Sequence, residues 1–417
     1  MEQRLLWIAG AFIGVNFLAL TLIRPAYGFT HSLSFGLWIA CAVIGSRILD
    51  RRLPKRDMLL FPLVMFMSGW GLTIIDRLAP RFADRQTIWL GVSVGAMLLV
   101  AILPQTIHWL RSYRYVWFTI GMGLLFSTIL LGSNPTGLSG TPQLWLGTAG
   151  VFFQPSEALK VILVAFLASY LAEQYPSLRT QGFASGNHLF STSPRIYGPI
   201  LMMWSLSIIV LIWQRDLGTA ILFFMVFLIL LYVATGYTFI LLSGLLLIVI
   251  AGFTAYNLFG VVQLRVDIWL NPWPEADGRA FQLVQSLQAF AAGGIFGQGI
   301  GQGSPGYIPV VHSDFVFAAI AEEWGLLGSI TVIVCIAIFI TRGLRIAALQ
   351  QGRPFRTLLA VGLTTLIGLQ SLMIMGGVLR VLPLTGVTLP YLSYGGSSLL
   401  MSFIMVGLLL RLSAQEN

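Results

Sequence analysis

The chain has 417 residues, of which 57% are hydrophobic and only 9% are charged. Soluble domains carry about 25% charged residues, so this composition excludes an ordinary soluble protein and indicates residence in a bilayer. The formal net charge of +9 favours contact with anionic lipid over nucleic acid, because the sequence holds no solvated basic domain for DNA or RNA.

The apolar segments predict an all-α polytopic membrane protein with about twelve transmembrane helices. Each segment approaches the roughly 20 residues that a helix needs to cross the hydrocarbon core. The first is too long for a signal-peptide core and lacks a good cleavage site, so we expect it to be retained. Cys41 and Cys335 lie inside apolar segments and predict buried thiols rather than a disulfide. The predicted helices cover residues 5–23, 31–49, 58–75, 87–103, 115–132, 155–174, 198–213, 217–235, 238–259, 315–341, 355–379 and 394–412.

Basic residues in the short connections predict the orientation of the chain. A cluster between Arg47 and Arg56 marks one side, and the basic residues within 111–114, 179–195 and 342–356 fall on that same side if all twelve helices span. Cytoplasmic connections are the richer in Lys and Arg. We therefore expect both termini in the cytoplasm and a large extracellular loop over residues 260–314.

Two polar patches at the predicted outer ends of helices each allow two interpretations. Glu157 and Lys160 lie three residues apart, so they share a helical face and can pair inside the bilayer. That pair is either a structural ion pair or a substrate contact. The polar break at residues 214–220 is either a bare hairpin turn or part of a site.

The long polar stretch 269–328 holds the sharpest candidate, Asp314. It lies just before an apolar helix, where the helix dipole favours the ionised carboxylate, so it can accept a proton or hold a cation. An N-cap role for Asp314 is equally open. His312 is more readily a loop histidine than a functional one, and the roles of Glu322 and Glu323, roughly two turns deeper, stay open.

The segment 382–398 interrupts two apolar runs with Pro, Gly, Ser and Tyr. Irregular backbone at membrane depth is tolerated only where it is buried in protein or lines a cavity. We expect a re-entrant loop that folds beside Asp314, with an ordinary external turn as the alternative.

Several motifs in order give the chain a resemblance to a known family. They read QPSE with Lys160, QRDLGTA, NPW followed by QLVQSLQAFAAGGIFGQG, IPVVHSDFVFAAIAEEWGLLG, and PLTGVTLPYLSYGGSS. With the apolar runs around them they cover roughly residues 85–412 and resemble the SEDS proteins of shape, elongation, division and sporulation, the family of RodA, FtsW and SpoVE. That family usually has ten helices, so residues 1–57 look like a two-helix extension to a core of 58–417. Leu144, Arg215 and Val310 depart from the family's usual Arg, Pro and Glu, which suggests a divergent branch.

The resemblance implies a peptidoglycan glycosyltransferase that polymerises lipid II at the outer face of the bacterial cytoplasmic membrane, for elongation or division. Asp314 matches the family's essential acid and would act as the general base. Undecaprenyl diphosphate would leave, assisted by basic residues that include Arg380, and Mg²⁺ or Mn²⁺ is an optional aid although no ligand cluster is evident. The implied partner is a class B penicillin-binding protein. The candidate substrate-binding residues are Trp145, Glu157, Lys160, Arg265, Arg279, Gln285, Ser286, His312, Ser393, Tyr394, Gly395, Gly396 and Ser397.

Three other functions fit the same sequence features. A lipid II flippase would also need a polar cavity and membrane acids, but no general base. A non-catalytic scaffold would hold a penicillin-binding protein and synthesise nothing. A polymerase or ligase of another surface polysaccharide would use a different undecaprenyl-linked donor.

Overall fold

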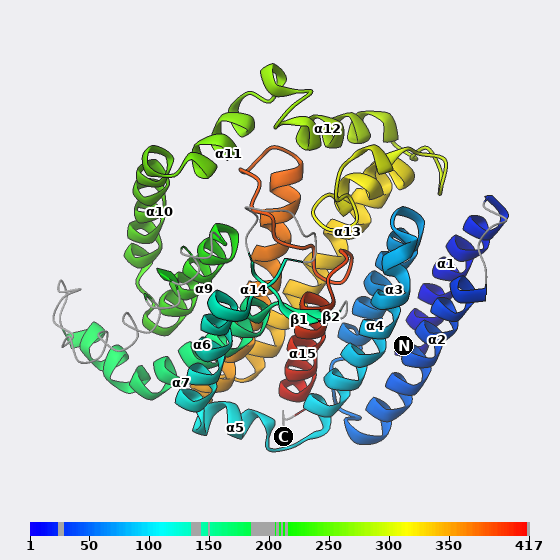
Figure 1. The fold of residues 1–417 in the computed structure, drawn as a ribbon. Coiled ribbons are helices and arrows are strands. Elements are labelled where there is room, and N and C mark those ends of the chain that lie inside the picture. The colour runs from blue at the N-terminus through cyan, green and yellow to red at the C-terminus, as the bar shows by residue number, and fades with distance from the viewer. Residues whose placement is uncertain are drawn as a thin grey trace. The chain divides into compact units, whose positions relative to one another are not determined.

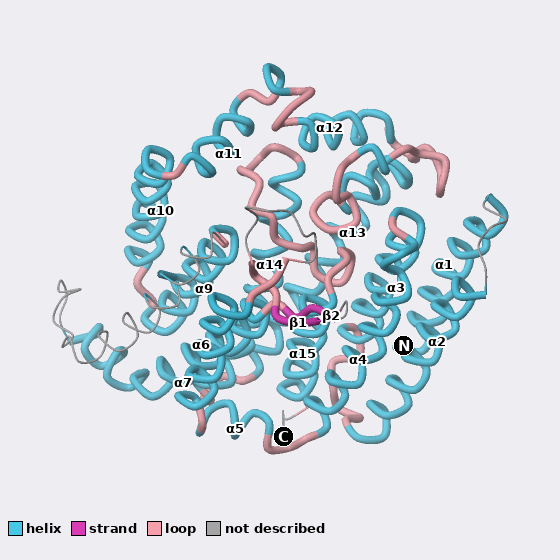
Figure 2. Tube along the Cα trace, in the orientation of Figure 1, coloured by secondary structure: helices cyan, strands magenta, loops and turns pink. Residues whose placement is uncertain are grey.

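The computed structural model describes residues 1–23, 29–134, 143–148, 151–184 and 216–414, together with the single positions 205, 208, 209 and 212. Helices dominate the described residues, and one short pair of strands is present (Figures 1 and 2). The chain divides into two compact units. The first holds residues 1–102, 251–342 and 370–414, and the second holds residues 103–250 and 343–369.

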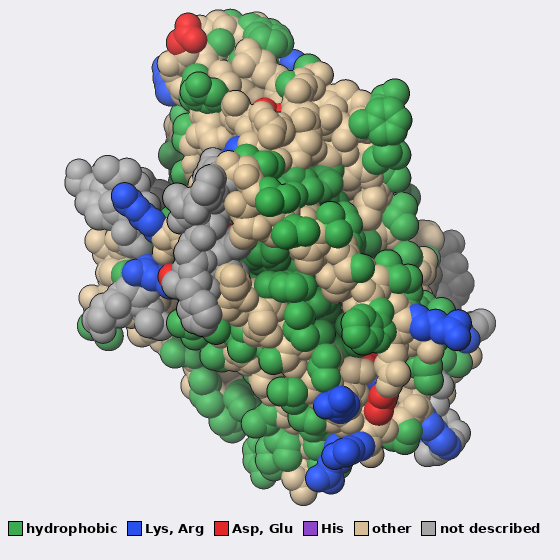
Figure 3. Space-filling view, turned by 90° about the vertical axis from the view of Figure 1, so that its right-hand side faces the viewer, with side chains coloured by type: hydrophobic (Ala, Val, Ile, Leu, Met, Phe, Trp, Pro, Cys, Tyr) green, Lys and Arg blue, Asp and Glu red, His purple; other side chains and the backbone are tan. Residues whose placement is uncertain are grey.

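Ten helices in the described part of the chain are long and apolar enough to cross a membrane. They coincide with ten of the twelve predicted segments. The segment predicted over 58–75 forms helix α3 (Leu60–Leu78), which carries Asp76 and Arg77 and does not count among the ten. The segment predicted over 198–213 lies almost wholly outside the described residues. Exposed apolar side chains spread over the face shown in Figure 3, as expected for a surface that meets lipid. The protein is therefore an all-α polytopic membrane protein.

The first unit packs its helices mainly around α4 and α15. Helix α15 lies along α4, α1 lies along α3, and α2 lies along α4. Close approach between α15 and α4 depends on Gly407, where a Cβ would meet the Met97 carbonyl oxygen at 2.6 Å. The helices of this unit are α1 (Glu2–Ile23), α2 (Phe29–Arg52), α3, α4 (Pro80–Ile102), α11 (Gly260–Leu270), α12 (Phe281–Gly293), α13 (Val316–Leu349) as far as Arg342, α14 (Pro354–Val378) from Gln370, and α15 (Gly396–Ser413), with short 3₁₀ turns at Trp273–Glu275 and Pro305–Tyr307.

The N-terminal helices are tied to this unit by charge and by aromatic packing. The buried Arg56 guanidinium lies 2.6 Å from the Glu2 carboxylate. Phe12 of α1 meets Trp70 of α3 edge to face at 5.5 Å, and Trp70 meets Trp324 of α13 at 5.5 Å in the same manner. The assignment of residues 1–57 as a separate extension stays a prediction. Its two helices pack against the next helices of the chain, α1 against α3 and α2 against α4.

The second unit is built around α7, which packs against α6, α9 and α5. Asp216 begins α9 as an N-cap, because its carboxylate accepts a hydrogen bond of 3.2 Å from the Thr219 amide. The elements of this unit are α5 (Thr106–Ser112), α6 (Arg114–Leu131), the antiparallel strands β1 (Leu146–Thr148) and β2 (Val151–Phe153), α7 (Pro155–Ala184), α9 (Leu217–Thr235), and the parts of α10 (Thr238–Leu258), α13 and α14 that fall in its residue ranges.

The region predicted as an extracellular loop over residues 260–314 contains two helices, α11 and α12. Both are too short to span a bilayer, at 11 and 13 residues. They are the elements that position the candidate site.

Candidate functional site

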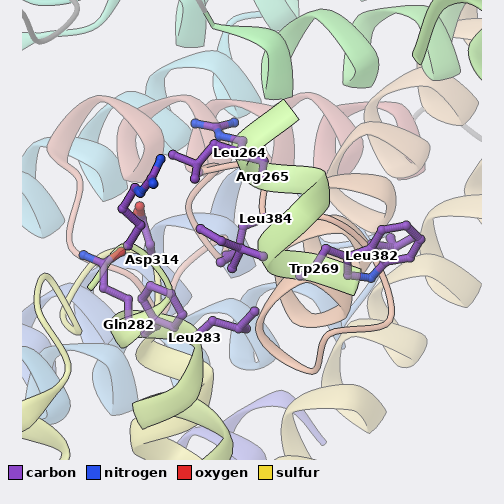
Figure 4. A pocket seen from close by; sticks show the side chains of 13 residues that line it. Leu264, Arg265, Trp269, Gln282, Leu283, Asp314, Leu382 and Leu384 are labelled. Atoms are coloured by element: carbon purple, nitrogen blue, oxygen red, sulfur yellow. The ribbon is translucent and has the colours of Figure 1, made fainter. Parts of the chain in front are cut away.

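A cavity of about 200 Å³ lies in the first unit, next to the start of α13. Its walls come from α11, α12, the residues that enter α13, the end of α14 and the segment that follows. Figure 4 shows Asp314 and Gln282 on one side and Trp269 and Leu382 on the opposite side. The lining residues are Leu264, Arg265, Ile268, Trp269, Arg279, Gln282, Leu283, Asp314, Phe315, Gly377, Leu382, Leu384 and Gly386.

Asp314 is the one acid among the described residues that line this cavity. Asp314 is half-buried, and its carboxylate accepts a hydrogen bond of 2.7 Å from the Ser313 hydroxyl. Within the described part of the chain, no backbone amide of the first turn of α13 donates to it. The carboxylate is therefore not used as an N-cap, which was the alternative left open by the sequence.

The surroundings of Asp314 shift its acidity. Burial raises the pKa of the Asp314 carboxyl above its ordinary value, while the Ser313 hydrogen bond and the Arg265 guanidinium both lower it. Burial is the largest of these effects. A carboxylate with a raised pKa is a stronger base than an ordinary aspartate, so Asp314 is better suited to take a proton.

The segment between α14 and α15 fixes the backbone of the Asp314 motif. The Ser393 hydroxyl donates a hydrogen bond of 2.5 Å to the Ser313 carbonyl, and the Tyr394 amide donates one of 2.8 Å to the His312 carbonyl. Leu389 and Leu392 of this segment are buried. The segment thus folds beside Asp314, as predicted, and holds the acid in place, although Leu382 at its start is 40% exposed. Its re-entry into the membrane stays a prediction.

His312 packs as an aromatic ring beside the cavity and does not line it. Its imidazole stacks on Phe82 at 5.1 Å, and the Tyr394 ring lies 4.8 Å from the same Phe82. Burial lowers the pKa of the His312 imidazole, which favours its neutral form. The contacts fit the loop histidine that the sequence favoured.

Two arginines place positive charge in the cavity with Asp314. Arg265 of α11 is partly buried and donates a weak hydrogen bond of 3.5 Å to the Thr385 carbonyl. Arg279 is exposed and pairs with Glu275 at 3.3 Å. Since a surface pair of this kind contributes little stability, Arg279 can exchange its partner for an anionic ligand.

Arg380, a further diphosphate candidate, is used structurally. Its guanidinium donates to the Trp269 carbonyl at 2.8 Å and to the Leu270 carbonyl at 2.6 Å. The Trp269 indole donates back to the Arg380 carbonyl at 3.1 Å. Arg380 therefore closes the end of α11 and is not among the residues that line the cavity.

The other predicted binding residues of this unit are not among the residues that line the cavity. Ser286 is fully buried and donates to the Leu283 carbonyl at 2.8 Å, while Gln285 lies beside it on α12. The Gly395 amide donates to the Gln86 side chain at 3.3 Å. Gly396 packs on Trp89, and Ser397 is buried in the first turn of α15. Their contact with substrate stays a prediction.

Three predicted binding residues belong to the second unit. The Lys160 ammonium lies 2.8 Å from the Glu157 carboxylate, and both side chains are buried in α7. Trp145 pairs with Ser133 through backbone hydrogen bonds of 2.8 and 3.3 Å. The predicted Glu157–Lys160 ion pair is therefore formed, while a substrate contact for any of the three stays a prediction. Gln214 and Arg215 of the QRDLGTA motif lie outside the described residues.

Glu322 and Glu323 hold the glycine-rich segment that follows α12. The Glu322 carboxylate accepts a hydrogen bond of 2.6 Å from the Ser304 amide, and the Glu323 carboxylate lies 3.2 Å from the Arg77 guanidinium. Arg77 also donates to the Gly301 and Gly303 carbonyls at 3.3 and 3.1 Å. These contacts give both acids a structural role.

Gln282 and Trp269 line the cavity but were not singled out from the sequence. Gln282 is an uncharged residue in the first turn of α12, and no motif in the sequence distinguishes it from the other glutamines of that helix. Among the described residues, no group of three or more His, Cys, Asp or Glu is arranged to hold a metal ion.

Comparison of the sequence with known proteins identifies the family that it matches. The sequence model of the FtsW, RodA and SpoVE family, described as cell cycle protein, matches residues 56–417. Peptidoglycan glycosyltransferase RodA of Mycobacterium tuberculosis is 35% identical over 394 residues, which cover 91% of this chain and 83% of that protein. Stage V sporulation protein E of Bacillus subtilis is 32% identical and covers 80% of this chain and 87% of its own length.

Solved structures agree in fold. A chain from a peptidoglycan synthase complex, described for the coordination of polymerisation and crosslinking, aligns with a TM-score of 0.71 at 26% identity and covers 87% of this chain and 98% of its own. The rod shape determining protein RodA of Thermus thermophilus aligns with a TM-score of 0.61 at 22% identity and covers 86% and 96%. By sequence and fold, the chain belongs to the FtsW, RodA and SpoVE family.

Proposed function

We propose that this chain is a peptidoglycan glycosyltransferase that polymerises lipid II, the undecaprenyl diphosphate-linked disaccharide precursor of the cell wall. The observation that carries the proposal is one cavity that combines the Asp314 carboxylate with the Arg265 and Arg279 guanidinium groups. Relatives over most of the chain carry the name peptidoglycan glycosyltransferase.

The reaction needs a base at the attacking sugar. The 4-hydroxyl of an acceptor GlcNAc attacks C1 of the donor MurNAc and gives its proton to the Asp314 carboxylate. The new C1–O bond forms as the bond from C1 to the diphosphate oxygen breaks, and undecaprenyl diphosphate leaves with the electron pair. Attack opposite the leaving group inverts the anomeric centre.

The leaving diphosphate needs positive charge on the other side of the sugar. Arg265 and Arg279 supply it, because guanidinium groups bind phosphate oxygens in pairs and stabilise the charge that develops. Mg²⁺ or Mn²⁺ as an aid stays a prediction, and such an ion would bind mainly through the oxygens of the substrate diphosphate.

The distribution of basic residues supports an orientation, and the family supports a location in the cytoplasmic membrane. We place the chain in the bacterial cytoplasmic membrane with both termini in the cytoplasm and the Asp314 cavity at the outer face. The likeness to a chain of a peptidoglycan synthase complex supports a partner with crosslinking activity, and we propose a class B penicillin-binding protein. The activity would serve elongation or division.

Purified full-length chain supplied with fluorescent lipid II tests the proposal. We expect a ladder of glycan chains on a gel, and a muramidase should digest that ladder. A parallel assay follows the passage of the same lipid across sealed vesicles. Transport without glycan synthesis would favour a flippase, and neither activity with retained binding to a penicillin-binding protein would favour a scaffold. Polymerisation of only another undecaprenyl-linked sugar would replace the substrate.

A further inference from the structure

The segment that joins α12 to α13 has an unusual composition for a connection outside the spanning helices. Residues 294–313, between the end of α12 and Asp314, contain no Asp, Glu, Lys or Arg. In this segment the side chains of Ile295 and Phe296 are 59% and 80% exposed. Contiguous exposed apolar surface marks a protein or membrane contact more often than scattered single side chains do.

Backbone hydrogen bonds fix this apolar tip, Ile295–Phe296, against α13. The Leu326 amide donates to the Gly294 carbonyl at 2.9 Å, and the Leu327 amide donates to the Ile295 carbonyl at 3.3 Å. In the opposite direction, the Gln298 amide donates to the Glu322 carbonyl at 2.8 Å. The tip therefore has a defined position at the kink of α13, where Gly325 leaves the helical conformation.

The part of α13 that follows the kink, residues 326–349, is long enough to cross the hydrocarbon core of a bilayer. From Leu326 onward, exposed apolar side chains recur with helical spacing at Leu326, Leu327, Ile330, Ile333 and Val334. The opposite face is buried, with Val332, Ile336 and Phe339 almost inaccessible. In a membrane-spanning helix an exposed apolar stripe of this kind is the face expected to meet acyl chains. The tip lies next to the first residues of the stripe, because Leu326 and Leu327 are bonded to Gly294 and Ile295.

We infer that Ile295 and Phe296 insert into the bilayer leaflet on the side of the Asp314 cavity. The occupant of this surface is lipid, because the tip adjoins the exposed apolar face of a helix that is long and apolar enough to span the membrane. Apolar and aromatic side chains bury favourably at the boundary of headgroups and acyl chains.

The insertion gives the tip a mechanical role. The tip follows directly from the end of α12, and α12 carries Gln282 and Leu283 into the cavity wall. Anchoring the tip would therefore set the depth of that wall relative to the headgroups. A role of this depth in positioning a lipid-linked sugar rests on the proposed function, whereas the insertion of the tip into the bilayer does not.

An environment-sensitive fluorophore at Phe296 tests the inference in proteoliposomes. The label is attached to Phe296→Cys in the full chain carrying Cys41→Ser and Cys335→Ala, and Ile295→Cys provides a second probe. Asp277→Cys, at an exposed charged position of the same loop region, is the aqueous reference, and Ile333→Cys is the acyl-chain reference. Quenching is measured with aqueous iodide and with nitroxide-labelled lipids.

We expect the label at Phe296 to emit at shorter wavelength than at Asp277, to lose intensity to lipid nitroxides and to resist iodide. Emission and iodide quenching equal to those at Asp277 would overturn the inference. Short-wavelength emission without quenching by lipid nitroxides would also overturn it, since another protein surface would then cover the tip.

Discussion

The Asp314 carboxylate and its Ser313 neighbour give the most specific prediction at the scale of single residues. Burial raises the pKa of Asp314 and the Ser313 hydroxyl opposes that rise by donating to the charged form. A base is active above its pKa and loses activity as the pH falls through it. Ser313→Ala removes the donor, so the acid limb of the pH–rate profile should move to higher pH.

Polymerisation rates measured across pH for wild type and Ser313→Ala check this shift. Ser304→Ala is the matched control, because Ser304 contributes its backbone amide to Glu322 and should leave the profile unchanged. An acid limb that stays in place, or moves to lower pH, would show that Asp314 does not supply the titrating base.

Val310 carries backbone strain four residues before Asp314. Its φ is 57°, in the left-handed region that a β-branched residue rarely adopts, and its side chain is exposed. Val310→Asn should raise the free energy of unfolding by about 1 kcal/mol, because Asn tolerates this conformation. The thermal unfolding midpoint of the purified protein measures the effect.

Val311→Asn is the control for that substitution. Val311 is buried, so a polar amide there should lower the midpoint by the cost of an unsatisfied polar group, about 1–3 kcal/mol. A lower midpoint for Val310→Asn would mean that the left-handed backbone at this position is not a source of strain.

Charged residues of the cavity could be predicted from the sequence, whereas uncharged ones could not, and the reason is physical. Asp314, Arg265 and Arg279 line the cavity because charged side chains are costly near a membrane unless they face a polar space. Gln282 was missed because an uncharged amide carries no such signal. The buried hydroxyl of Ser286 satisfies a backbone carbonyl, a use that residue type alone does not distinguish from ligand binding.

At the scale of elements, the kink in α13 depends on Gly325. Its φ is 68°, and a Cβ there would meet the Gly297 nitrogen at 2.3 Å and the Ile295 oxygen at 2.5 Å. Gly325→Ala should therefore destabilise by more than about 1 kcal/mol and free the tip from α13. Thermal unfolding, together with hydrogen exchange of residues 294–303, measures both effects.

Gly95→Ala in α4 is the counterpart, because a Cβ at Gly95 meets nothing within 4 Å. Alanine there should be neutral or stabilising by up to about 1 kcal/mol. If Gly325→Ala were equally well tolerated, the kink would not be required by the packing of the tip.

Long apolar segments could be placed from the sequence, while the short elements could not. A span of about 20 apolar residues has one stable conformation in lipid, a helix. Helices α11 and α12 and the strands β1 and β2 are short, and their stability depends on tertiary packing rather than on their own residues. The sequence therefore predicted a plain loop where the cavity walls are formed.

At the scale of the whole molecule, charge distribution predicts the orientation in the membrane. A membrane-impermeant thiol reagent should label Asp277→Cys from outside intact cells, in a chain that lacks its own cysteines. Lys55→Cys should react only after the membrane is opened, because the basic cluster that includes Lys55 marks the cytoplasmic side. The reverse pattern would place the Asp314 cavity in the cytoplasm and would contradict polymerisation at the outer face.

The assignment of Asp314 as the general base is tested most directly by single-turnover polymerisation of lipid II by Asp314→Asn, purified as the full chain. Removing a general base should lower the rate by at least about 100-fold while the protein keeps its thermal unfolding midpoint. Asp277→Asn, which neutralises an exposed carboxylate outside the cavity, should retain the wild-type rate. A wild-type rate of glycan synthesis by Asp314→Asn would contradict the account.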